Sequence, residues 1–158
     1  ILIQTLMLAL TKRENYVNYS SGSGQQVTMQ GALITKTKGM GTNLVSLVIN
    51  KNSPFLTMQN PNKWPSDNFR TYGFLSPLNQ IHTYTFNCKL FVKEKEIIEI
   101  VNVNYPLTKV LEECDGQGKS FDNIYWVFDN GFIWRSKQWI SPKEVYAYVN
   151  IINPLDTD

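Results

Sequence analysis

Alternating side chains between Ile81 and Val92 are the feature that most narrows what this chain can fold into. In the stretch IHTYTFNCKLFV, the apolar residues share one parity and most polar residues share the other. The apolar set is Tyr84, Phe86, Cys88, Leu90 and Val92. Successive side chains of a strand point to opposite faces, so the pattern predicts a half-buried β-strand with Cys88 pointing inward. The charged run KEKE then predicts a turn, and IIEIVNV and TKVLEEC predict two further strands of a meander.

The rest of the chain is typical of short strands separated by turns. Strand-like runs occur at YVNYSS, QQVTMQGALITKTKG, NLVSLVIN and VYAYVNII, and no window shows a convincing helical period. The segment 50–69 is rich in proline, asparagine and serine, which predicts a long irregular connection. We therefore predict a single all-β domain over residues 1–158. Its antiparallel meanders would form either a two-sheet sandwich or paired small β-units, with little or no helix.

The pair Asn130–Gly131 separates two aromatic runs, which is a strong signal for a β-hairpin. A two-residue loop would place Trp126 opposite Arg135 and would put aromatic rings on both faces. A three-residue loop that includes the preceding aspartate would place Trp126 opposite Trp134. We favour this second register because it segregates the two faces more cleanly. One face then carries Ile124, Trp126, Phe128, Phe132 and Trp134.

Most of these aromatic residues are expected to be core, because aromatic cross-strand pairs and their buried area dominate small cores. A second use of the rings would be a platform on which a sugar or a base stacks, which requires rings that share an open face. The rings that we expect to be most exposed are Trp64, Tyr125 and Trp139. They are the candidate binding residues.

The two cysteines, Cys88 and Cys114, lie in strand-like segments and lack the spacing of a zinc knuckle or a redox C-x-x-C motif. They are either a disulfide or two buried thiols. We favour the disulfide, since no cysteine is left over. A loop of that size would stabilise the fold by roughly 3 to 4 kcal/mol. An oxidised pair would indicate an oxidising compartment.

Charge and hydropathy argue against two classes of partner. The net charge of +2 is small and the lysines are scattered, so we predict no nucleic-acid partner. No apolar run approaches the roughly 20 residues that a membrane-spanning helix needs. The opening ILIQTLMLAL has neither the basic segment nor the cleavage site of a signal peptide. We expect it to be a buried strand in a chain from which a targeting segment has been removed.

Residues with catalytic or metal-binding chemistry are few. The single histidine, His82, begins the apolar face of a strand, and we expect it to be a partly buried structural residue. No His, Cys or carboxylate cluster has ligand spacing, so we predict no metal site and no cofactor. Glu112 and Glu113 could form a glycosidase pair, but strand neighbours point to opposite faces. We therefore assign no catalytic residue and predict that the protein is not an enzyme.

Three stretches carry a resemblance to a known family. They are GALITKTKGMGTNLVSL, FNCKLFVKEKEIIEIVNV with the later VLEECDG, and FDNIYWVFDNGFIWRSKQWISP, of which the last is the most specific. Together they resemble the YjbF/GfcB family of Gram-negative outer-membrane lipoproteins linked to capsule and exopolysaccharide export. The likeness covers about Leu6 to Pro154. The lipid-modified cysteine that the family carries at its mature N-terminus is not in this sequence.

The resemblance implies an all-β, YmcC-like fold whose cysteines face the oxidising periplasm, with no catalytic residues. It implies a place on the periplasmic face of the outer membrane, held by a lipid upstream of Ile1. It also implies a non-enzymatic accessory role in exopolysaccharide or capsule secretion. The implied partners are other export proteins of the envelope and the polysaccharide itself. The alternative hypothesis is a carbohydrate-binding module that uses exposed aromatic rings.

Overall fold

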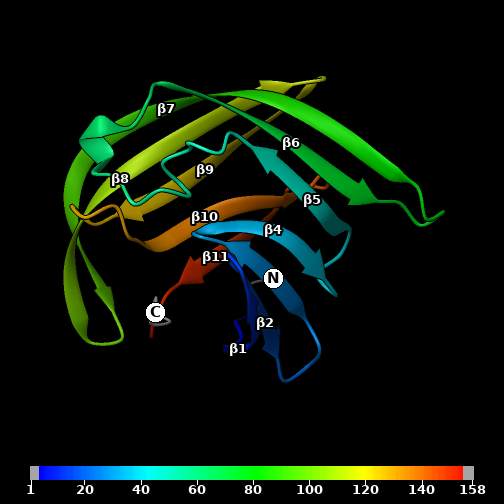
Figure 1. Cartoon of the computed structure of the whole chain (residues 1–158), viewed down its shortest axis with the longest axis horizontal. Coiled ribbons are helices and arrows are strands. Elements are labelled where there is room, and N and C mark those ends of the chain that lie inside the picture. The colour runs from blue at the N-terminus through cyan, green and yellow to red at the C-terminus, as the bar shows by residue number, and fades with distance from the viewer. Residues whose placement is uncertain (1–3, 155–158) are drawn as a thin grey trace.

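The small sheet of the protein contains the first four strands. The computed structural model describes residues 4–154 of the chain. Strands β1 (Met7–Arg13), β2 (Tyr16–Ser21), β3 (Gln26–Gln30) and β4 (Leu33–Lys38) pair in chain order as an antiparallel meander (Figure 1). Gly24 connects β2 to β3 in a left-handed conformation, with φ of 86°, which a glycine adopts without strain.

The large sheet contains the remaining seven strands, again antiparallel, in the order β11-β10-β9-β8-β7-β6-β5. Their bounds are β5 (Asn43–Ile49), β6 (Asp67–Leu75), β7 (Ile81–Ile100), β8 (Val103–Gly116), β9 (Lys119–Val127), β10 (Ile133–Ser141) and β11 (Val145–Asn150). One 3-10 helix, η1 (Pro61–Lys63), lies in the connection between β5 and β6. The all-β prediction, with antiparallel meanders and little helix, is therefore confirmed. Within residues 4–154, no helix has the length and the apolar composition needed to cross a bilayer.

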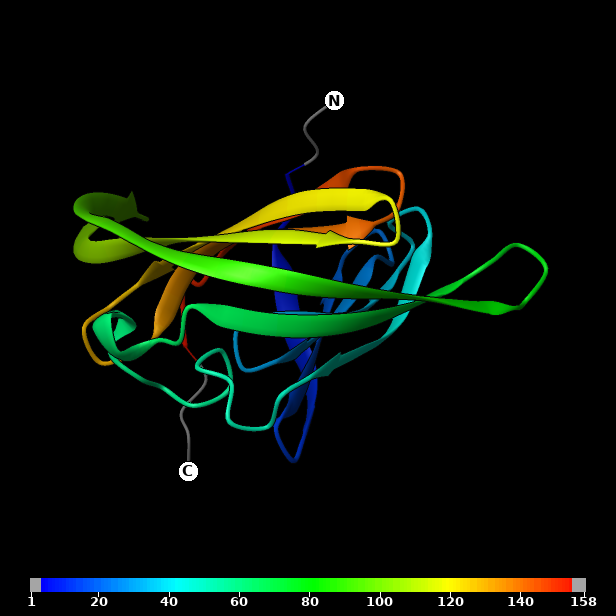
Figure 2. The same cartoon turned by 90° about the horizontal axis from the view of Figure 1, so that it is seen from above.

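The two sheets share a core. The large sheet curves over the small one, and the strands of the small sheet run across those of the large sheet (Figures 1 and 2). Val27, Met29 and Ile34 of the small sheet belong to the same buried cluster as Tyr72 and Trp139 of the large sheet. A buried amide also joins the sheets: Gln138 Oε1 accepts from Ile34 N at 3.0 Å, and its Nε2 donates to Ala32 O at 2.8 Å. We propose on this basis that the chain folds as one domain.

The hairpin of β7 and β8 is longer than the sequence predicts. The KEKE run does not form a turn, because β7 continues through it with one irregularity between Val92 and Lys95. The turn lies instead at Val101 and Asn102, whose φ values of 47° and 62° fit a type I′ turn. Residues 93–109, called the arm below, extend beyond the main core and curl at one end of the molecule (Figure 1). Charged residues are tolerated there because the arm is largely exposed to solvent.

Two expectations about burial at strand ends are wrong. Residues of the opening segment form β1, but this is an exposed edge strand, with Leu8 at 65% and Leu10 at 62% exposure. The strand pairs only with β2. Residues 1–3 of the predicted segment lie outside the described part of the chain. His82 is exposed rather than partly buried, because β7 begins beyond the edge of the shared core.

The hairpin of β9 and β10 around Asn130–Gly131, called the tryptophan hairpin below, has the predicted loop but an altered register. Phe128 N donates to Phe132 O, Gly131 N donates to Phe128 O, and Gly131 is left-handed with φ of 92°. These features confirm the three-residue loop. An irregularity between Ile133 and Arg135 then leaves Trp134 unpaired, so that Trp126 lies opposite Arg135. The face that carries Trp126, Phe128, Phe132 and Trp134 is half-buried, whereas Tyr125, Val127 and Ile133 of the other face are core.

Candidate functional site

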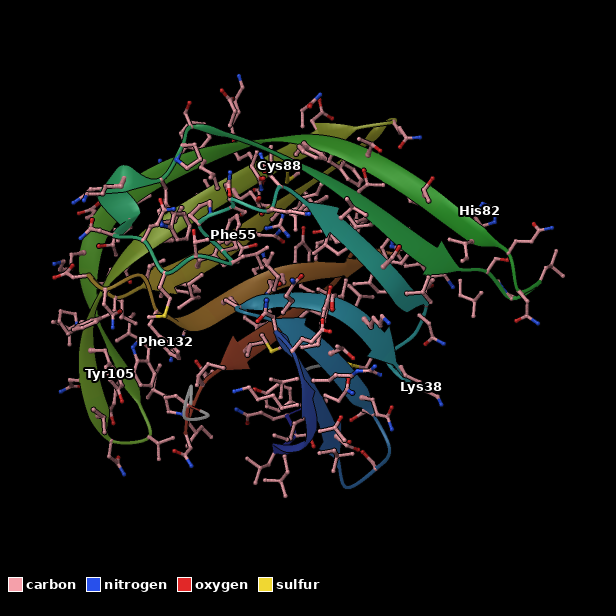
Figure 3. All side chains as sticks on the ribbon, in the orientation of Figure 1. Lys38, Phe55, His82, Cys88, Tyr105 and Phe132 are labelled. Atoms are coloured by element: carbon pink, nitrogen blue, oxygen red, sulfur yellow. A yellow bond between two sulfur atoms is a disulfide. The ribbon has the colours of Figure 1, made fainter. Side chains whose placement is uncertain are left out.

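The connection between β5 and β6 is ordered by packing rather than by regular structure. It is the irregular segment that the sequence predicts, and its Phe55 and Trp64 are buried. Their rings meet edge-on with centroids 5.0 Å apart, and Phe55 also lies 4.6 Å from the ring of Tyr125 on β9. Figure 3 shows Phe55 between the connection and the large sheet.

Two glycines let this connection approach the strands closely. A Cβ on Gly31 would lie 2.8 Å from Phe55 O, and one on Gly131 would collide with the backbone of Met58 and Gln59. Side-chain contacts add to this fit. Asn60 Nδ2 donates to Asp129 O at 3.1 Å, which ties the connection to the tryptophan hairpin. The segment therefore forms a fixed cover over the inner face of the large sheet.

Beneath this cover lies a buried ion pair between Arg70 on β6 and Glu112 on β8. Arg70 Nε donates to Glu112 Oε2 at 2.9 Å, and the two side chains are only 1% and 0% exposed. Asn68 Nδ2 donates to the same oxygen at 2.8 Å. The other carboxylate oxygen accepts from Asn123 Nδ2 at 2.9 Å and from Tyr125 Oη at 3.1 Å. Four donors therefore satisfy the carboxylate of Glu112 without solvent.

The guanidinium of Arg70 is satisfied in the same way. Its Nη1 donates to Tyr72 Oη at 3.2 Å, and its Nη2 donates to Tyr125 Oη at 2.8 Å. The Phe55 ring lies 4.9 Å from the guanidinium carbon, a distance at which the cation is attracted by the ring. A buried charge of this kind is tolerated only when it is paired and hydrogen-bonded, as it is here.

Electrostatics keep these groups in fixed protonation states. Burial lowers the pKa of Arg70, but the adjacent Glu112 carboxylate and the two tyrosine oxygens raise it, and the net result is a pKa well above the ordinary value. Burial raises the pKa of Tyr125 well above its usual range and also raises the pKa of Tyr72. At neutral pH the cluster therefore holds a charged arginine and two neutral phenols. None of these groups is poised to exchange a proton with a substrate.

The disulfide lies beside the ion pair. Cys88 on β7 and Cys114 on β8 face each other in the strand register and are bonded, which confirms the disulfide and excludes the two free thiols. Ligand atoms of Cys88, Glu112 and Cys114 fall within 4.8 Å of one another, a spacing that would suit a metal ion. Both sulfurs are committed to the disulfide and the carboxylate is engaged by four donors, so this trio has no free ligand to offer a metal.

The three rings predicted to be exposed are buried. Trp64 is 8%, Tyr125 0% and Trp139 3% exposed. Trp64 packs edge-on against Phe55 and donates from Nε1 to Gln59 O at 3.0 Å. Trp139 stacks on Phe121 with ring centroids 4.3 Å apart. The expectation of exposure is wrong because each ring fills the space between the sheets or under the cover, and none presents an open stacking face.

Glu112 and Glu113 lie on opposite faces of β8, as strand alternation requires: Glu112 is buried and Glu113 is exposed. Arg70 is not among the predicted site residues, although the sequence contains a signal for it. In the run NFRTYGFL, Arg70 shares its parity with Tyr72 and Phe74, which places a charge on an inward face. A charge at such a position demands a partner of opposite sign, and Glu112 has the same inward parity as Cys114.

An open cavity adjoins this cluster at the edge of β6. Its volume is about 290 Å³, and it lies where β5 has ended, because β5 pairs with β6 only as far as Ile49 opposite Arg70. Both ends of the β5–β6 connection and the facing residues of β6 and β7 line it. Asn68 belongs to both places, since it lines the cavity and donates to Glu112. The buried cluster is sealed, so this cavity is the neighbouring surface that a ligand can reach.

Comparison with known proteins agrees with this architecture. The chain is similar to the crystal structure of the hypothetical lipoprotein YmcC from Escherichia coli (K12), with a TM-score of 0.80 and 15% identity, covering 97% of this chain and 79% of that one. No curated protein shows significant sequence similarity to this chain. Residues 3–151 match the family described as group 4 capsule polysaccharide lipoprotein gfcB, YjbF. The chain therefore belongs to the YjbF family of group 4 capsule polysaccharide lipoproteins.

Proposed function

We propose that this protein is a non-enzymatic accessory lipoprotein of capsule or exopolysaccharide secretion. It would act on the periplasmic face of the outer membrane, together with other export proteins of the envelope. Family membership over residues 3–151 is the observation that carries the proposal. Attachment would be through a lipid on a residue upstream of Ile1.

Two features of the structure support this reading. The disulfide suits an oxidising compartment such as the periplasm. The carboxylate of Glu112 is fully buried and engaged by four donors, so it cannot serve as a general acid or base in the folded protein. The chemistry of the cluster is that of a structural element, which fits an assembly or binding component better than a hydrolase.

A clean deletion of the gene in the producing strain tests the role. We expect surface and extracellular polysaccharide to fall while lipid-linked precursors persist, because synthesis would continue without efficient export. The wild-type gene supplied in trans should restore output, and membrane fractionation should place the full-length protein with the outer membrane. Normal polysaccharide output in the deletion strain would contradict the proposal. Release of sugar from the isolated polysaccharide by the purified protein would contradict its non-enzymatic part.

A further inference from the structure

The open cavity beside the buried cluster has a composition that selects a class of ligand. Its lining includes Asn50, Asn52, Asp67, Asn68, Phe69 and Asn87. No lysine, arginine or histidine lines the cavity, so an anionic ligand would find no positive partner there. At about 290 Å³ the cavity is near the lower limit of the roughly 300–1,000 Å³ typical of ligand pockets, a size suited to one or two small rings.

Amides are the dominant polar groups of this cavity. An asparagine offers both a donor and an acceptor, as does a hydroxyl group, so the two are complementary in either direction. Asn52 and Asn87 are exposed to solvent, and among residues 4–154 their side-chain amide groups have no protein acceptor. A ligand that carries several hydroxyl groups would replace the water at these amides without leaving a buried polar group unpaired.

An aromatic ring completes the cavity. Phe69 is 42% exposed and lies directly opposite Asn87 in the pairing of β6 with β7. The C–H face of a pyranose ring is apolar and can cover such a ring, which removes apolar surface from water. A flat apolar surface beside amides therefore matches the two sides of a sugar, its C–H face and its hydroxyl edge.

The cavity is held in place by the buried cluster. Asn68 lines the cavity and donates its Nδ2 to Glu112 on the inner face of the sheet, which ties this edge of the cavity to the cluster. Ser53 anchors the first part of the connection: its backbone N donates to Asn50 O at 3.0 Å, and its Oγ accepts from Phe55 N at 3.4 Å. Because these contacts fix the backbone around the cavity, a ligand would not have to order that backbone when it binds.

We propose that this cavity is a binding site for a neutral saccharide. The amides of Asn52 and Asn87 bond to sugar hydroxyls, and Phe69, on the same face of the sheet as Asn87, packs against the C–H face of one ring. The site differs from the buried rings Trp64, Tyr125 and Trp139. The inference deepens the proposed role in polysaccharide secretion and rests on it for the source of the saccharide.

The test titrates the purified ¹⁵N-labelled protein with neutral oligosaccharides prepared by partial hydrolysis of the producing strain's polysaccharide. We expect saturable shifts of the side-chain amide signals of Asn52 and Asn87. Asn87→Ala should weaken binding about threefold to tenfold, because it removes neutral hydrogen bonds. Phe69→Ala should weaken binding about tenfold, because it removes the apolar surface. Heparin, a polyanionic saccharide, should not compete.

Matched variants separate the cavity from general effects of substitution. Asn104→Ala changes an exposed asparagine in the arm, and Phe91→Ala changes a partly exposed phenylalanine on β7, so both should bind like the wild type. Absence of saturable shifts, or equal binding by Asn87→Ala and the wild type, would overturn the inference. Normal export in the gene deletion, with binding intact in vitro, would instead remove the proposed function and leave the saccharide site standing.

Discussion

The two halves of the β7–β8 hairpin differ sharply in what holds them. The inner half, residues 81–92 and 110–116, carries the disulfide and Glu112. Its inward residues lie in the core shared by the two sheets. The arm, residues 93–109, buries Ile98, Ile100 and Leu107 in a smaller cluster, against which Trp126, Phe128 and Trp134 of the tryptophan hairpin pack. Its Ile97, Val101 and Val103 are exposed.

Apart from this smaller cluster and the pairing of Thr108 and Lys109 with β9, the contacts between the arm and the rest of the protein lie near the surface. Tyr105 stacks on Trp134 with ring centroids 4.3 Å apart, and Arg135 Nη2 donates to Glu99 O at 3.2 Å. Lys95 Nζ forms an exposed ion pair with Asp129 at 3.0 Å. Because global stability resides in buried and cross-linked contacts, we infer that the inner half opens only when the protein unfolds. The arm is expected to open locally.

The largest expected effect follows from breaking the buried ion pair. Glu112→Gln leaves Arg70 charged and without its counter-ion in the interior, which should lower the free energy of unfolding by about 3 to 5 kcal/mol. Urea unfolding followed by tryptophan fluorescence measures this change. Glu113→Gln is the matched control, since Glu113 is exposed on the same strand, and it should change the value by less than about 0.5 kcal/mol. Similar losses for the two variants would contradict a structural role for the pair.

Removal of the disulfide should have the next largest effect. The cysteines are 26 positions apart, and closure of such a loop is worth about 3.5 kcal/mol in the chain-entropy model. The double variant Cys88→Ala/Cys114→Ala should therefore fold but unfold at lower urea concentration. An unchanged midpoint would show that the inner half does not depend on this cross-link. The unfolding should remain a single transition if the chain is one domain.

The sequence predicts the inner half of the hairpin much better than it predicts the arm or the buried cluster around Arg70 and Glu112. Alternation through Phe86, Cys88 and Leu90 identifies a strand that is half-buried, and the burial of all three agrees. The partnership of Arg70 with Glu112 joins residues 42 positions apart, so no local pattern predicts it. The arm is harder still, because Val101 and Asn102 turn the chain without a glycine and KEKE lies within a strand. Alternation locates a face, but it does not say where a sheet extends beyond its core.

Alkaline pH should lower the contribution of the buried Arg70–Glu112 cluster to the free energy of unfolding. The folded pKa values of Tyr72 and Tyr125 are raised, so their stabilising contribution is fully present below pH 10 and is lost as pH rises further. Each tyrosine then contributes a slope of up to about 1.4 kcal/mol per pH unit to the free energy of unfolding. Urea unfolding between pH 8 and 11 should show this decline, and Tyr125→Phe should make it shallower. An equal slope in the variant would count against the assignment.

The smallest effect is expected in the arm. Lys95→Ala removes an exposed ion pair with Asp129, and such pairs are worth between about 0.2 and 1 kcal/mol. Thermal unfolding at low and moderate salt should show a small loss in stability that salt screening reduces further. A loss as large as that of Glu112→Gln would mean that the arm belongs to the same cooperative unit as the inner half.

Native-state amide hydrogen exchange tests the central distinction most directly. Amides of residues 86–90 and 110–114 should exchange only through global unfolding, and their exchange free energies should match the value from urea. Amides of residues 95–107 should exchange through local openings at clearly lower free energy. Equal protection in the two sets, each at the global value, would contradict the account.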